Sequence, residues 1–234
     1  MSKPASYTFY FAGELFSAKH LYGNALLAEA IFSLSGGRYV AVLPQNLEPR
    51  EVTAHAIRDA DLHALLSCDL GLFHYDGPEL DSGTVVEYLF AKFADIPSVL
   101  LRSDFRSAGD AKTLGGDSWN LMSSFYPRTR IVELNAMALY QQGLPPLGPS
   151  AESSVEVLWQ KKSSEQGRLM TEQIAHAVIR AFDEILTLPP ALPAELTESV
   201  YRWLALLPNL QGSAEENIRL LLELSAKKRA KDLL

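Results

Sequence analysis

The chain has 234 residues, 47% of them hydrophobic, which is enough for one domain with a large core and room for a smaller appendage. Its net charge of −7 argues against a polyanionic partner such as nucleic acid. The single cysteine, Cys68, excludes an intrachain disulfide, and the lack of a signal-peptide pattern or of a window of roughly 18 apolar residues predicts a soluble, cytoplasmic protein without membrane contact.

Short apolar segments alternate along the chain with longer segments whose apolar residues recur at helical spacing. In chain order we expect a strand at 7–13, a helix at 18–34, a strand at 39–44, a helix at 49–66, a strand at 70–75, a helix at 84–95, and strands at 98–102 and 130–134. Strands that alternate with helices form βαβ units. The pattern therefore predicts an α/β fold, a five-stranded parallel sheet flanked by helices, of the Rossmann-like or flavodoxin-like type.

The composition changes after residue 143. The segment "GLPPLGPSAESS" has the Pro, Gly and Ser content of a linker, and helical patterns follow at 165–187, about 194–207 and 214–231. The last of these opens with Ser213 and Glu216 at the spacing of a capping box. We therefore divide the chain into an α/β domain, 1–143, and a helical extension, 144–234, for which packing or oligomerisation is the expected role.

The stretch 76–90, "DGPELDSGTVVEYLF", gathers acidic residues after the third predicted strand. Ligands of open parallel sheets bind beyond the carboxyl ends of the strands, which is where this stretch lies. One interpretation is helix capping, either as a capping box from Thr84 to Glu87 or with Asp81 as the N-cap. Capping leaves Asp76 and Glu79 without a role.

The other interpretation is catalysis. A carboxylate in the first turn of a helix is held ionised by the partial positive charge and the backbone N–H groups of that turn. Placed there, Glu87 could attack the anomeric carbon of a sugar and form a covalent ester. Such chemistry needs an acid for the leaving group and a group that orients the nucleophile, and Asp61 and Asp81 are the candidates.

Five segments, "YFAGELFS", "LPQ", "DADL", "DSGTVVE" and "WNLMSS", occur in the order found in nucleoside 2-deoxyribosyltransferases, and the resemblance covers about 7–134. It implies that Glu87 is the nucleophile, which takes the 2-deoxyribosyl group from a nucleoside and passes it to another base. It also implies that Asp61 protonates the leaving base and that Asp81 binds the sugar and orients Glu87. The implied ligands are 2-deoxynucleosides and free nucleobases, with no cofactor.

The resemblance extends to substrate-binding residues. Tyr10 lies where the family places a tyrosine against its nucleophile, and Gln45 is a candidate reader of base edges. Asn120, in "NLMS", matches a residue that reaches the 5′-hydroxyl of the sugar in the site of a neighbouring subunit, so a homo-oligomer with shared sites is implied. Asp76, in the same loop as Asp81, completes the expected substrate contacts.

The sequence leaves alternatives open. The family usually has a small residue two places after its nucleophile, where this chain has Leu89 in "EYLFA". A hydrolase of deoxynucleoside 5′-monophosphates would need a phosphate cradle after the first strand, where Glu14 would repel the ligand. A nucleoside-binding module without catalysis is the third alternative. The five histidines have no metal-ligand spacing, so no metal site is expected.

Overall fold

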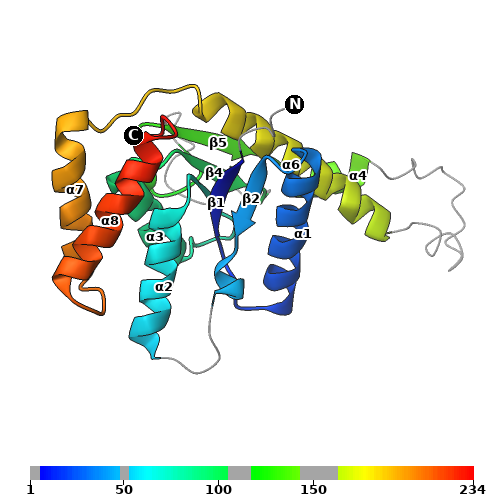
Figure 1. Cartoon of the computed structure of the whole chain (residues 1–234). Coiled ribbons are helices and arrows are strands. Elements are labelled where there is room, and N and C mark those ends of the chain that lie inside the picture. The colour runs from blue at the N-terminus through cyan, green and yellow to red at the C-terminus, as the bar shows by residue number, and fades with distance from the viewer. Residues whose placement is uncertain (1–5, 48–52, 105–116, 143–162) are drawn as a thin grey trace, which may run out of the picture.

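The computed structural model describes residues 6–47, 53–104, 117–142 and 163–234. Within these ranges, five strands form one sheet in the order β2-β1-β3-β4-β5, and every neighbouring pair is parallel (Figure 1). The strands are β1 (Tyr7–Ala12), β2 (Tyr39–Val42), β3 (Leu70–His74), β4 (Ser98–Arg102) and β5 (Thr129–Glu133). The predicted five-stranded parallel α/β fold is confirmed. Strand order reverses between β1 and β3, the position at which sheets of this kind hold their ligands.

Helices connect and cover the strands. They are α1 (Ala18–Leu34), α2 (Ala54–Ser67), α3 (Ser82–Phe93), α4 (Ala136–Gln142), α6 (Ser163–Ile185), α7 (Ala194–Leu206) and α8 (Ala214–Arg229), with 3-10 helices η1 (Pro44–Asn46) and η2 (Leu121–Ser123). The second strand ends earlier than predicted because Pro44 begins η1. The described part of the second helix begins at Ala54, capped by Thr53, and the first residues predicted for it, 49–52, lie outside the described residues.

Both faces of the sheet are buried, as expected for parallel strands joined by helices. Because successive side chains of a strand point to opposite faces, Phe9 and Phe11 of β1 enter one core while Tyr10 enters the other. The first core lies under α1 and α6, where the ring of Phe182 lies 5.2 Å from that of Phe9. The second lies under α2 and α3, and α8 packs outside them against α2 (Figure 1).

The three long C-terminal helices pack on the sheet unit in two ways. Helix α6 supplies side chains to the core on the α1 face, and α7 and α8 form a hairpin beside α2 (Figure 1). The capping box predicted for Ser213 and Glu216 is present at the start of α8. The division of the chain at residue 143 stays a prediction. Within the described ranges, no helix combines the length and the apolar character that a bilayer crossing requires.

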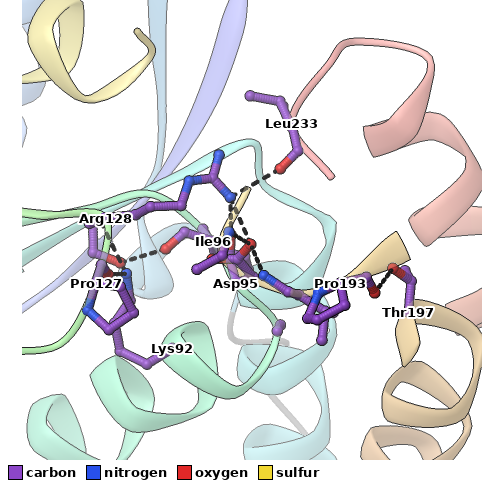
Figure 2. Close-up of polar contacts among 12 residues, drawn as sticks. Lys92, Asp95, Ile96, Pro127, Arg128, Pro193, Thr197 and Leu233 are labelled. Carbon is purple, nitrogen blue, oxygen red and sulfur yellow. Dashed lines mark hydrogen bonds and ion pairs between the residues drawn. The ribbon is translucent and has the colours of Figure 1, made fainter. Parts of the chain in front are cut away.

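A buried ion pair holds the ends of the α7–α8 hairpin (Figure 2). The Arg128 Nη1 lies 2.9 Å from Oδ2 of Asp95 and donates to the backbone carbonyl of Leu233. The same Asp95 oxygen accepts the backbone N–H groups of Ala191 and Leu192, at 2.7 and 2.9 Å. One pair of charges therefore fixes both the chain entering α7 and the chain leaving α8 against the edge of the sheet.

Candidate active site

A short hydrogen bond joins β1 to α3. The hydroxyl of Tyr10, which is fully buried, donates to Oε1 of Glu87 at 2.6 Å. Tyr10 reaches α3 because it points to the α2–α3 face of the sheet, opposite to Phe9 and Phe11. This is the contact between tyrosine and glutamate that the family resemblance implies, and it fixes one carboxylate oxygen of Glu87 in place.

The environment of Glu87 differs from the one predicted. Helix α3 begins at Ser82, so Glu87 is its sixth residue and lies in the second turn, beyond the unpaired backbone N–H groups of the first. Burial is the largest influence on Glu87 and raises its pKa, which the nearby charges of Asp61 and Asp81 raise further; the Tyr10 hydroxyl opposes them. The net result is a pKa of about 7 for Glu87. The hypothesis that backbone amides keep this carboxylate ionised is therefore wrong.

Asp81 is the N-cap of α3. Its Oδ2 accepts the backbone N–H of Thr84 at 2.7 Å and the Thr84 hydroxyl at 2.8 Å. Thr84 is the third helical residue, so the alternative capping box from Thr84 to Glu87 does not form. Capping thus accounts for Asp81 but not for Glu87, and the charge of Asp81 still acts on the neighbouring glutamate.

Asp61 and Glu87 line one cavity of about 600 Å³ between α2, α3 and the turn that joins α7 to α8. This volume lies within the usual range for small-molecule sites. The other walls are largely apolar, with Ile57 from α2, Val86 and Phe90 from α3, and Pro208 from the turn. The cavity therefore joins two carboxyl groups from different helices to apolar surfaces that can pack against a flat ring.

Asp76 lies elsewhere. Its carboxylate accepts the backbone N–H and hydroxyl of Ser103, at 2.6 and 2.5 Å, and the backbone N–H of Asp104 at 3.0 Å, and it lies 2.9 Å from Nε2 of His74. Burial opposes the charge, but the His74 contact and the Ser103 hydrogen bonds outweigh burial and hold the pKa of Asp76 well below its usual range. These bonds tie the end of β3 to the end of β4, and Asp76 is not among the residues that line the Asp61–Glu87 cavity.

Gln45 and Asn120 also lie outside this cavity. The Gln45 amide donates to the backbone carbonyl of Leu21 at 3.0 Å. Asn120 is exposed and caps η2, its side-chain oxygen accepting the N–H of Met122 at 2.9 Å. It lines a neighbouring cavity, together with Leu89. Asn120 is thus presented at the surface and is not among the residues that line the cavity of Glu87 in its own chain.

Of the residues that line this cavity, only Asp61 and Glu87 were predicted from the sequence as site residues, and Arg58 and Pro208 are among those that were not. Arg58 precedes Asp61 by three positions, so helical spacing within "RDADL" could have placed both on one face of α2. Pro208 comes from the C-terminal extension, far from every quoted motif, and carries no local signal. Among the described residues, no group of three or more His, Cys, Asp or Glu side chains is arranged to hold a metal ion.

The family model described as nucleoside 2-deoxyribosyltransferase matches residues 9–145, which is more than half of the 234 residues. The chain therefore belongs to the nucleoside 2-deoxyribosyltransferase family, a family of transferases that act on nucleosides and nucleobases.

Two solved structures are similar to parts of the chain. A conserved protein from Enterococcus faecalis V583 is 28% identical, with a TM-score of 0.47, over 55% of this chain and 92% of that chain. A 2-desoxiribosyltransferase from Leishmania mexicana is 18% identical, with a TM-score of 0.41, over 68% of this chain and 97% of that chain. A comparison with curated proteins found no match.

Proposed function

We propose that this protein transfers the 2-deoxyribosyl group of a nucleoside to another nucleobase through a covalent intermediate on Glu87. The observation that carries the proposal is the 2.6 Å hydrogen bond from Tyr10 to Glu87, made at a cavity that Asp61 also lines. A nucleophile held by one partner, with an acid facing the same space, is the arrangement that glycosyl transfer through an ester requires.

The reaction has two steps. In the first, a carboxylate oxygen of Glu87 bonds to C1′ of the sugar while the bond from C1′ to the base nitrogen breaks, and its electron pair stays on the base. Asp61 donates a proton to a ring nitrogen of that base, which makes it a better leaving group. In the second, a nitrogen of the acceptor base gives its proton to Asp61 and bonds to C1′, the ester bond breaks and the Glu87 carboxylate is restored.

Tyr10 and Asp81 set the protonation and direction of Glu87. Burial, with the charge of Glu87 as the next cause, raises the pKa of Tyr10 far above its usual range, so that Tyr10 remains an O–H donor throughout the neutral range. Only ionised Glu87 is a nucleophile, and its pKa of about 7 makes the ionised fraction rise with pH near neutrality. Asp81, fixed as the cap of α3, does not line the cavity and in this proposal acts on Glu87 through its charge.

The remaining predicted residues have different roles in the proposal. Asn120 contacts the sugar in a neighbouring subunit, because it is exposed and separated from Glu87 of its own chain. Asp76 positions the loops after β3 and β4 instead of binding substrate, since Ser103, Asp104 and His74 occupy its oxygens. Gln45, bonded to a backbone carbonyl of α1, has no substrate contact.

Product analysis with a 2-deoxynucleoside, with and without an acceptor base, tests the proposal. We expect a new nucleoside only when the acceptor is present. Free base and deoxyribose without an acceptor would identify a hydrolase, and turnover of only the 5′-monophosphate would identify a nucleotide enzyme. The control pair is Glu87→Gln, expected to be inactive, and Glu79→Gln, which changes an exposed acid in the loop before α3 and is expected to retain activity. No base release from any deoxynucleoside would overturn the proposal in favour of a binding module.

A further inference from the structure

The turn between α7 and α8, residues 207–213, is attached to helix α2 by polar contacts to its backbone. Asp59 accepts the backbone N–H of Gln211 at 2.7 Å through Oδ2. The carbonyl of Asn209 lies 3.2 Å from Nη2 of Arg58, which donates to it, and 3.0 Å from Nε2 of His55. Three polar residues of α2, at positions 55, 58 and 59, therefore hold two residues of this turn.

The carboxylate of Asp59 is buried and fully hydrogen-bonded where it holds the turn. It is only 6% exposed, and its other oxygen accepts two hydrogen bonds from the Arg58 guanidinium, at 3.0 and 2.6 Å. Burial opposes its charge, but the N–H of Gln211 and then Arg58 outweigh burial and lower the pKa of Asp59. From the other side of the turn, the buried amide of Asn217 donates to the Gln211 carbonyl at 3.2 Å. A buried charge with this many partners is costly to displace, so the turn keeps its position.

The hairpin is also fixed at its other end. Asp95 and Arg128 hold the start of α7 and the end of the chain (Figure 2), and Lys231 pairs with Asp69 at 2.8 Å. With both ends attached, α7 and α8 cannot swing away from α2 without breaking one of these buried contacts. The turn is thereby a rigid part of the cavity wall.

Pro208 is the residue that this turn contributes to the cavity of Asp61 and Glu87. Arg58, which donates to the Asn209 carbonyl of the turn, lines the same cavity and lies three positions before Asp61 on the same face of α2. Asp61 is the group that the proposed mechanism places at the leaving base, so the attached turn borders the base end of the cavity.

We propose that the α7–α8 turn completes the base-binding end of the active site, with Pro208 as a specificity-determining wall and Asp59 as its positioning residue. The proposal rests on the proposed function and assigns the helical extension a part in choosing between purine and pyrimidine bases. A proline ring is stiff and apolar, so it can pack on the face or edge of a base while limiting the size of the ring system that fits. A smaller side chain at this position leaves room for the larger bases.

The test is the ratio of kcat/KM for 2′-deoxyadenosine to kcat/KM for thymidine. We expect Pro208→Ala to raise this ratio about tenfold, the effect typical of one or two methylene groups in an apolar pocket. Asp59→Asn should raise it in the same direction, although Asp59 does not line the cavity, because the turn loses its charged attachment. The matched control is Pro193→Ala, an exposed proline at the start of α7, which should leave the ratio unchanged.

A merely structural role would lower the amount of folded enzyme and so reduce both values of kcat/KM by the same factor, leaving their ratio constant. If the wild type exchanges bases and both Pro208→Ala and Asp59→Asn keep the wild-type ratio, the role of Pro208 in base selection is refuted. The proposed function is then unaffected. The ratio of the Kd values of adenine and thymine, measured by calorimetry on the same proteins, gives the same comparison without turnover. An inactive wild type whose Kd ratio still shifts in Pro208→Ala would overturn the transferase proposal alone.

Discussion

At the scale of single residues, Glu87 experiences opposite influences on its charge. Burial and the neighbouring carboxylates favour the protonated form, while the Tyr10 hydroxyl favours the ionised form. The balance puts its pKa at about 7, so both forms are populated at neutral pH. Because only the ionised carboxylate attacks in the proposed reaction, the rate of that reaction should depend on pH near neutrality.

Removal of the Tyr10 hydroxyl should shift this balance. In Tyr10→Phe, Glu87 loses the hydrogen bond that favours its ionised form, so its pKa should rise above 7 by about one to two pH units, the worth of a hydrogen bond to a charged group. The pH profile of base release in single-turnover experiments measures this change: activity should fall about tenfold or more at pH 6 and recover toward high pH. Tyr7→Phe on the opposite face of β1 is the control, and an unshifted profile in Tyr10→Phe would refute the role of the hydroxyl.

The raised pKa of Glu87 also makes a prediction about stability. Its pKa of about 7 in the folded protein exceeds the ordinary 4.5, so between these values the folded state binds more protons than the unfolded state. The contribution of Glu87 to stability is then fully present below pH 4.5 and is lost as pH rises to 7, by an amount on the order of 3 kcal/mol.

Glu87→Gln removes this titration, so the variant should gain stability relative to the wild type as pH rises from 4.5 to 8. Urea unfolding of both proteins across this range measures the difference. Lys92, whose pKa burial lowers to about 7, titrates in the same window but is common to both proteins and cancels. A pH-independent difference would show that Glu87 has the same pKa in the folded and unfolded states.

At the scale of the elements, hydrophobic periodicity predicted most of the fold because each strand and helix carries its own apolar pattern. Some element boundaries, and one short helix, were not predicted from the apolar pattern. Pro44 shortened the second strand by starting η1. Helix α4 was not predicted because its seven residues are too few to show a helical repeat of apolar positions. The start of α3 was placed two residues late because either Asp81 or Thr84 could cap it.

The part of the candidate site that lies within segments resembling the family could be predicted from the sequence. The motifs identified Tyr10, Asp61 and Glu87, which the structure brings to one region. They did not reveal that Asp76 and Gln45 bond to other parts of the chain, because those partners are set by the folded arrangement of β3, β4 and α1. Pro208 could not be predicted from the sequence for the same reason, since only the packing of α7 and α8 brings it to α2.

The ion pair of Asp95 and Arg128 should dominate the attachment of the helical hairpin. In Asp95→Asn, Arg128 stays buried without its countercharge, which typically costs about 3–5 kcal/mol. Asn tolerates the positive φ of 53° at this position, so backbone strain is not added. Asp232→Asn, an exposed aspartate that also has a positive φ of 57°, is the matched control with an expected effect near zero. Urea unfolding compares the two, and equal stabilities would contradict the anchoring role.

At the scale of the whole molecule, helices α2 and α3 of the α/β unit carry Asp61 and Glu87, and the turn of the C-terminal hairpin adds Pro208 to the wall of their cavity. Asn120 is exposed and does not line the cavity of Asp61 and Glu87 in its own chain. We therefore propose that its contact with the sugar is made in a neighbouring copy of the chain, which would make the site complete only in an oligomer.

Mixing two inactive variants tests for shared sites. Glu87→Ala lacks the nucleophile and Asn120→Ala lacks the sugar contact, so a mixed dimer has one site with both residues intact. Random exchange in a dimer should restore about a quarter of wild-type activity. The unmixed variants are the controls, and subunit exchange is followed with differently tagged chains. Exchange without recovered activity would contradict the sharing of Asn120.

The central claim is that Glu87 forms an ester with the sugar, and peptide mass spectrometry after brief incubation with a 2-deoxynucleoside and rapid acid quenching tests it most directly. We expect the peptide containing Glu87 to gain the mass of one deoxyribosyl group in the wild type and not in Glu87→Gln. Base release with the sugar attached to another side chain, or an unmodified peptide and no released base, would contradict it.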